Sequence, residues 1–555
     1  MKTRRRGNHT ASKFVLLAIS LFLVASALFV PLSTKSAHAL SGAYPASQVI
    51  GQTNYTNTGA NAGGSVSGAG LNIDPGGGGI AVDTVNHRLF VADTVNNRVL
   101  VYPLSSSNNL TSTTATYVLG QVSVTATAAG SDVASGLSNP EGLAFDSTNN
   151  LLYVADTNNN RVMVFNTANL SDDMSASYVL GQTGLTSNGF GDTQSTLHNP
   201  NRLTLDPNDH LVFVSDGLNY RVLAFSTSAL SATGENASYV IGQASFTASA
   251  VGQTQSGLSS SAFQLANDMD PTGITYDSAD KLVWVSDPAN SRVLAYSTTN
   301  LSTTGENASY VLGTTSYTSD TDSGSANQGN IAGAYGLVWD SVNDVLYVVD
   351  ANDNRILGYP LSSGITNGEN ASTLIGQSTW SGAGNGVGQT VLNFPAAIAL
   401  DTSNNQMFVS DWFNNRVLEF NLVSITNSSS LAAAVSGQAY SQTLSTTGSQ
   451  GTVSFSLTGG SLPPGLSFNG TTGTISGTPT TAGTYTFEIA ASDNTGTTGT
   501  FTQDPSYTIT VSSPSSPNTG FGIFTNNIGQ TLLAFAAVVG ALTSLAVLSR
   551  RFAKR

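Results

Sequence analysis

Residues 142–165 decide the fold, and they read GLAFDSTNNLLYVADTNNNRVMVF. Three short apolar runs stand in this stretch, and residues that favour turns, mostly Asp, Asn, Ser and Thr, separate them. Apolar runs of this length between turn residues are typical of β-strands, whereas helices need longer periodic segments. The stretch therefore predicts three strands joined by two tight turns.

The same stretch recurs in six copies over about residues 73–422. In each copy an aspartate ends the second run and an arginine opens the third. The aspartates are Asp93, Asp156, Asp216, Asp287, Asp350 and Asp411, and the arginines are Arg98, Arg161, Arg221, Arg292, Arg355 and Arg416. Such a repeat indicates a series of similar structural units.

The copies resemble the NHL repeat. The pattern of this repeat has three parts in order: an apolar residue followed by Asp, then Tyr-Val-Ala-Asp, and then Asn-Asn-Arg-Val. The resemblance implies a β-propeller whose blades have four antiparallel strands each. A short motif of the type Val-Leu-Gly-Gln supplies the fourth strand. It follows five of the six copies and ends at Gln121, Gln182, Gln243, Thr314 and Gln377.

The sixth copy lacks this motif, which instead precedes the first copy as Val49-Ile50-Gly51-Gln52. We predict that this N-terminal strand completes the last blade. It would close a six-bladed ring that has no open strand edge.

We expect the repeated Asp and Arg residues to be structural. A guanidinium can cap loop carbonyls and pair with an aspartate of its own or a neighbouring blade. A ring of ligand-binding arginines is the alternative, but binding sites seldom use all blades equally. We expect no cofactor. Calcium at the aspartate loops is an alternative that no specific motif supports, because an arginine adjoins each such loop.

Binding residues are expected on the face that carries the connections from one blade to the next, because these connections vary in length. On this face Trp412 and Phe413 replace small or polar pairs of the other blades. Tyr220 replaces an asparagine, and His198 lies in the connection into the third blade. Exposed aromatic rings suit a protein or glycan ligand. Packing of Trp412 on a neighbouring blade or domain is the alternative.

Catalysis is not expected. The amidating lyases among NHL propellers hold zinc near the axis, and a catalytic zinc usually takes three protein ligands. After Ala39 only His87, His198 and His210 remain, and the first and last of these fall in hairpin turns. Carboxylate chemistry stays open, although no blade stands out by carboxylates that break the repeat. A lyase or lactonase-like hydrolase, or a purely structural envelope protein, is the alternative to a binding module.

Residues 433–512 contain Leu-Pro-Pro-Gly-Leu at 462–466 and Gly-Thr-Pro-Thr at 477–480. This segment resembles the Ig-like domain of bacterial surface proteins, which implies a β-sandwich. We expect it to act as a spacer, with direct adhesion as the alternative.

Both ends of the chain carry membrane signals. Residues 1–39 are predicted to be the signal peptide of an exported bacterial protein, because they have a basic start, an apolar run and then Ala37-His38-Ala39. An uncleaved membrane anchor is the alternative. The propeller then spans 40–425, a Ser/Pro linker 513–527, a transmembrane anchor 528–549 and a basic cytoplasmic tail 550–555. Pro517-Asn518-Thr519-Gly520 resembles a sortase sorting motif, except that Ser516 stands where Leu is usual. A sortase-type transpeptidase is therefore an expected partner, and a plain membrane anchor is the alternative.

Charge restricts the ligands. Six of the 19 basic residues precede Ala39, and four lie in the last six positions. Residues 40–549, the exported part, therefore contain nine basic residues and all 33 acidic residues. This acidic surface repels phosphate backbones, and we expect no nucleic-acid partner. The chain has no cysteine, which excludes disulfides.

Overall fold

The computed structural model describes residues 44–514, except 75–76, 131–132, 259–272, 320–324, 362–363, 448, 450–451, 495–501 and 504–505. The predicted signal peptide, sorting motif, transmembrane anchor and basic tail lie outside these residues, as does all but the start of the linker. In the described part of the chain, no helix is long and apolar enough to cross a membrane.

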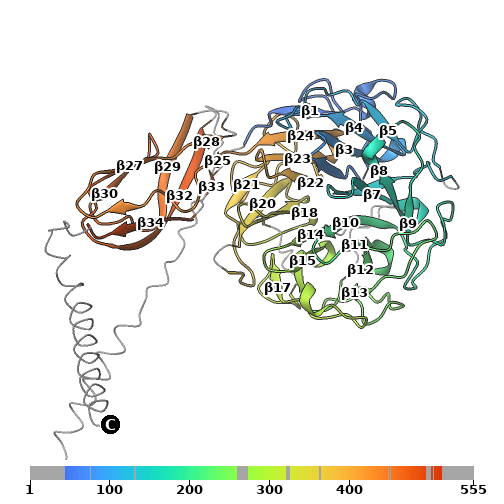
Figure 1. The fold of residues 1–555 in the computed structure, drawn as a ribbon. Helices are drawn as coiled ribbons and strands as arrows, with labels where there is room; N and C mark the ends of the chain where they lie inside the picture. Colours follow the sequence, from blue (N-terminus) through green and yellow to red (C-terminus); the bar gives the residue numbers. More distant parts are fainter. Residues whose placement is uncertain are drawn as a thin grey trace, which may run out of the picture.

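Six antiparallel sheets of four strands each occupy the described residues up to Asn421 (Figure 1). Sheet 1 contains β2 (Ile80–Asp83), β3 (Arg88–Asp93), β4 (Arg98–Pro103) and β5 (Tyr117–Leu119). Sheet 2 contains β6 (Pro140–Asp146), β7 (Leu151–Asp156), β8 (Arg161–Asn166) and β9 (Tyr178–Leu180). Sheet 3 contains β10 (Pro200–Asp206), β11 (Leu211–Asp216), β12 (Arg221–Ser226) and β13 (Tyr239–Ile241).

Sheet 4 contains β14 (Ile274–Asp277), β15 (Leu282–Asp287), β16 (Arg292–Ser297) and β17 (Tyr310–Leu312). Sheet 5 contains β18 (Ala334–Asp340), β19 (Val345–Asp350), β20 (Arg355–Pro360) and β21 (Thr373–Ile375). Sheet 6 contains β22 (Pro395–Asp401), β23 (Gln406–Asp411), β24 (Arg416–Asn421) and, as its outer strand, β1 (Gln48–Ile50).

The sheets form a propeller, as the repeat predicted. The innermost strands contact one another in the order β2, β6, β10, β14, β18 and β22, and β22 contacts β2 again. Figure 1 shows the resulting ring around a central axis. Aliphatic and aromatic side chains fill the space between neighbouring sheets, and Trp284 is among the largest that are fully buried.

The predicted role of the N-terminal strand is confirmed. β1 pairs antiparallel with β24, with Val49 opposite Leu418 and Ile50 opposite Val417. The main-chain nitrogen of Ala46 donates to the oxygen of Gln389 at 2.7 Å. The first described residues are therefore part of the last sheet.

Two kinds of turn join the strands within a sheet. The hairpin between the first and second strands has one residue in the left-handed region: His87, Asn150, His210, Lys281, Asp344 or Asn405. Thus His87 and His210 lie in hairpin turns, as the sequence predicted. The turn after each repeat Asp is a single 3₁₀ turn in five sheets: η2 (Thr94–Asn96), η3 (Thr157–Asn159), η5 (Gly217–Asn219), η6 (Pro288–Asn290) and η8 (Trp412–Asn414). We call the propeller end that carries these turns the loop face, and the other end the hairpin face.

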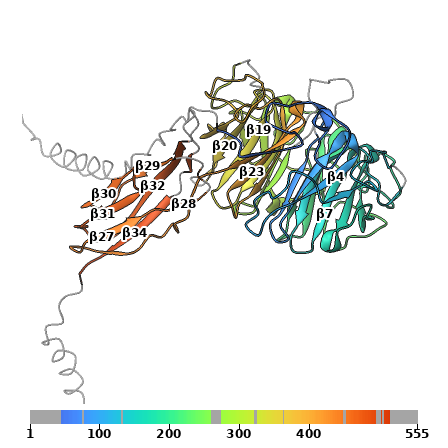
Figure 2. The ribbon, with the colours of Figure 1, turned by 90° about the horizontal axis from the view of Figure 1, so that it is seen from above.

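Three further 3₁₀ turns lie in connections: η1 (Ala60–Gly63), η4 (Thr167–Asn169) and η7 (Thr298–Asn300). The second domain is a sandwich of short strands (Figure 2). One sheet contains β26 (Ala434–Val435), β34 (Ser506–Ser512), β32 (Gly483–Asn494), β29 (Thr452–Gly460) and β33 (Thr502–Gln503). The other contains β27 (Tyr440–Thr443), β31 (Thr474–Gly477) and β30 (Leu466–Asn469), while β25 (Ser424–Ile425) pairs with β28 (Thr446–Thr447). Ile475, Phe487 and Ile509 lie buried in its core.

Candidate functional site

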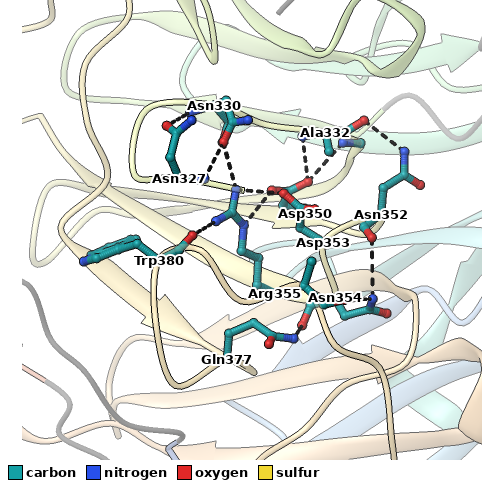
Figure 3. Close-up of polar contacts among 12 residues, drawn as sticks. Asn327, Asn330, Ala332, Asp350, Asn352, Asp353, Asn354, Arg355, Gln377 and Trp380 are labelled. Atoms are coloured by element: carbon teal, nitrogen blue, oxygen red, sulfur yellow. Dashed lines mark hydrogen bonds and ion pairs between the residues drawn. The ribbon is translucent and has the colours of Figure 1, made fainter. Parts of the chain in front are cut away.

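The repeat Asp and Arg form a buried ion pair in each sheet, and Figure 3 shows the pair of sheet 5. Arg355 Nε donates to Asp350 Oδ2 at 2.7 Å, and neither side chain is exposed. The other guanidinium nitrogens donate to the main-chain oxygens of Trp380, at 2.8 Å, and Asn330, at 3.1 Å. The pair therefore ties two connections of the loop face to the sheet.

The other five pairs repeat this geometry, with Nε to Oδ2 distances of 2.6–2.7 Å. Burial raises the pKa of Asp156 and of Asp216 to about 6, while the arginine and the donated hydrogen bonds act in the opposite direction. Both carboxylates are thus ionised at neutral pH. The six guanidinium groups are engaged inside the propeller, away from any ligand at its surface.

In four sheets the left-handed residue that ends the turn after the repeat Asp is an asparagine that braces the next sheet. Asn97 Oδ1 accepts from the main-chain nitrogen of Asn139 at 2.9 Å, and Asn160 Oδ1 accepts from that of Asn199 at 2.9 Å. Tyr220 occupies this position in sheet 3 with φ 51°. A tyrosine has no side-chain amide at that distance from its backbone, so Tyr220 cannot form the same brace.

Four aromatic rings of sheets 5 and 6 form one cluster on the loop face. Trp412 is only 6% exposed and lies in one buried cluster with Ile80 of sheet 1 and with Ile73, which precedes that sheet. Phe413 is 48% exposed and stacks on Trp412, with the ring centroids 4.2 Å apart and the planes 18° apart. Trp412 therefore supports Phe413 from below, and Phe413 is the ring that a ligand can reach.

Phe394 joins this cluster to the axis. Its ring contacts Trp412 edge-on at 5.0 Å, Phe413 at 5.6 Å and Tyr335 at 5.3 Å. Its φ is 56°, and the equivalent positions in sheets 2 and 3 hold Asn139 and Asn199. A bulky residue at positive φ is uncommon and costs free energy. The ring contacts of Phe394 offset that cost, and the position marks a departure of sheet 6 from the repeat.

A second aromatic pair lies in the connection into sheet 3. Phe190 is 70% exposed and stacks on His198, with centroids 4.6 Å and planes 19° apart. Partial burial lowers the pKa of His198, so its imidazole is neutral at neutral pH. The sequence singled out His198 but not Phe190, although Ala129, Val251 and Asn385 stand at the position of Phe190 in the corresponding connections, so aligning these connections would have found it.

The structure brings the predicted ligand residues together in two places rather than one. Trp412 and Phe413 belong to sheet 6. His198 precedes sheet 3, and its main-chain oxygen accepts from Leu218 at 3.1 Å, in the turn that ends at Tyr220. Sheets 3 and 6 are three steps apart in the ring of six, so the two places lie on opposite sides of the axis.

The axis holds charged groups that the repeat does not explain. Arg202 stands where the other sheets have Gly79, Gly142, Gly273, Gly336 and Ala397. It is buried, and its Nη2 donates across the axis to the main-chain oxygen of Ala396 at 3.2 Å. Buried Glu141 lies one position earlier in sheet 2. Burial lowers the pKa of Arg202, and the charges of Glu141 and Asp74 act in the opposite direction. Arg202 and Glu141 thus depart from the repeat at the axis, and aligning the six inner strands would have found both.

A small cavity lies on the axis. It adjoins Arg202 and has a volume of about 50 Å³, which is room for a few water molecules. Aliphatic side chains from every sheet line it: Ile80, Leu143, Leu203, Ile274, Leu337 and Ile398. A ligand larger than a few water molecules does not fit this cavity. Among the described residues, no group of three or more His, Asp or Glu side chains is placed to hold a metal ion.

Known families match two parts of the chain. The NHL repeat matches residues 137–165, and the family described as Putative Ig domain matches residues 423–512. NHL repeat-containing protein 2 of Gallus gallus is 35% identical over 106 residues, which cover 18% of this chain and 14% of that relative. The chain therefore contains an NHL-repeat propeller and an Ig-like domain, and it spans only a small part of the curated relative.

Solved structures show similarity at low identity. A chain of the nidogen/laminin complex is 14% identical, with a TM-score of 0.35, over 60% of this chain and 88% of that chain. A protein of unknown function from Bacteroides thetaiotaomicron is 13% identical, with a TM-score of 0.37, over 69% of this chain and 74% of that chain.

Proposed function

We propose that this protein is a binding module of the bacterial surface. A six-bladed propeller would present its loop face to a protein or glycan outside the cell, and the Ig-like domain would serve as its stalk. The single observation that carries the proposal is Phe413, a half-exposed ring held flat on buried Trp412. Rigidly supported aromatic rings give a large contact area at little entropic cost.

The scaffold beneath this ring supports a binding role. The buried Asp–Arg pairs fasten the connections of the loop face to the sheets, so the presented residues need little ordering when a ligand arrives. The repeated carboxylates are used in these pairs, which favours binding over catalysis. Attachment to the surface rests on the signal peptide and the anchor or sorting motif at the two ends of the sequence.

The test is a screen of protein and glycan arrays with the full chain, purified in a mild detergent. Phe413→Ala is compared with Val342→Ala, which removes a more exposed apolar side chain (63% against 48%) from the hairpin face. We expect Phe413→Ala to weaken the strongest interaction at least about tenfold, the loss typical of a contact residue that matters, and Val342→Ala to leave it unchanged. Equal affinity of both variants and the parent would refute the proposed face.

A further inference from the structure

The two aromatic pairs lie at the same end of the propeller, although one is in a connection and the other in the turn after a repeat Asp. The main-chain nitrogen of His198 donates to Asp216 Oδ1 at 2.6 Å, and that of Asn393 donates to Asp411 Oδ1 at 2.6 Å. His198 and Asn393 thus have the same position in the repeat. Phe413 donates from its main chain to the oxygen of Asn393 at 3.2 Å. Both pairs are therefore on the loop face, one at sheet 3 and one at sheet 6.

Each pair has the same construction. One ring is well exposed, Phe190 or Phe413, and it lies nearly parallel to a more buried ring, His198 or Trp412. We call these pairs the sheet 3 platform and the sheet 6 platform. An exposed flat ring held in this way offers its face to the apolar face of a sugar ring or to another flat group.

The charges of the loop face exclude acidic ligands. All nine basic residues of the exported part lie within the described residues. Seven are buried: the six repeat arginines and Arg202. The other two, Arg88 and Lys281, lie at the hairpin turns of the opposite face. No exposed cation on the described loop face is thus available to a carboxylate, sulfate or phosphate of a ligand, and the acidic chain would repel it.

We propose that the two platforms bind one uncharged polysaccharide chain that passes over the axis. This inference rests on the proposed function and specifies its ligand. A monosaccharide or short oligosaccharide can cover one platform only, because the platforms lie on opposite sides of the ring. A chain that reaches both gains affinity, since the second contact is made at a high effective concentration.

The experiment is affinity electrophoresis of the full chain through gels that contain one polymer each. Dextran, soluble starch and yeast mannan serve as uncharged polymers, and alginate and heparin serve as acidic ones. The variants are Phe190→Ala, Phe413→Ala and both together, with Val342→Ala as the control. The polymer that retards the parent most is then compared with its own trisaccharide by calorimetry.

We expect retardation by an uncharged polymer and not by the acidic ones. Either platform variant alone should weaken polymer binding by about 10²-fold, because the polymer then loses its second contact. If the platforms are equivalent, Phe190→Ala and Phe413→Ala should each change the affinity for the trisaccharide by no more than about two- to threefold, because one platform remains. Thermal melting shows whether each variant is folded.

Three outcomes would overturn the inference. If Phe413→Ala abolishes binding and Phe190→Ala has no effect on the polymer, the spanning chain is wrong while the proposed function stands. If neither variant weakens binding of the polymer, both the spanning chain and the proposed function are wrong. Retardation by none of the uncharged polymers, or stronger retardation by the acidic ones, rejects the ligand class.

Discussion

Asn415, at the end of the turn in sheet 6, accepts a hydrogen bond through its Oδ1 from the main-chain nitrogen of Ile73 at 2.9 Å. Asn97 and Asn160 bind the next sheet in the same way. The last sheet is thus joined to the first by the contact that joins other neighbours. Closure of the ring depends on this brace and on β1, which come from opposite ends of the propeller sequence.

Deletion of residues 40–53 is expected to destabilise the propeller strongly. It removes the strand opposite β24 and the side chain of Gln52, whose Nε2 donates to the main-chain oxygen of Asn415 at 2.9 Å. Loss of a paired strand and of buried Ile50 should cost several kcal/mol, or a fall in Tm of roughly 10 °C or more. Deletion of residues 40–43 alone is the control. A melting temperature within about 2 °C of the control would contradict closure by β1.

The buried ion pairs give a second prediction. Arg355→Met leaves buried Asp350 without its main partner, and such a loss typically costs about 3–5 kcal/mol. The control is Lys281→Met, because Lys281 is exposed on the hairpin face and has no ion pair among the described residues, so its loss should cost much less. Denaturant unfolding of both variants measures the difference. Equal losses would mean that burial of the repeat pairs has no energetic role.

Much of this architecture could be predicted from sequence, because it depends on patterns that occur in every copy. The Asp–Arg spacing, the apolar runs and the displaced Val49-Ile50-Gly51-Gln52 motif were enough to place the sheets and β1. The platforms were harder, because they depend on single departures from the repeat. Phe190 lies in a variable connection, and Phe394 matters through its positive φ and its neighbours. Only the folded chain shows that Phe394 meets Tyr335 and Trp412.

A pH dependence follows from Glu419. This residue of β24 is buried, and desolvation raises its pKa from 4.5 to about 7. Between about pH 4.5 and 7 the folded chain keeps a proton that the unfolded chain loses. The free energy of unfolding should therefore fall as the pH rises through this window. Glu419→Gln cannot ionise, so it should remove this part of the fall.

Calorimetric melting of parent and variant from pH 4.5 to pH 8 measures this effect. We expect the variant to gain stability relative to the parent as the pH rises, with the largest gain above about pH 7. A constant difference between the two proteins across the range would show that Glu419 is ionised in the fold.

Separate substitutions in the sheet 6 platform should distinguish support from contact. Trp412 is 6% exposed and packs with residues of sheet 1, whereas Phe413 is 48% exposed. Trp412→Ala should therefore leave a cavity and cost about 3–5 kcal/mol of stability. Phe413→Ala should cost much less, because a half-exposed ring buries little apolar surface.

Both variants should lose affinity for a ligand of the loop face, Phe413→Ala by removing the contact and Trp412→Ala by removing its support. Trp412→Phe keeps a flat ring under Phe413 and should restore most of the affinity. If Phe413→Ala proved as destabilising as Trp412→Ala while binding was unaffected, both rings would serve packing alone, and the platform would not be a ligand site.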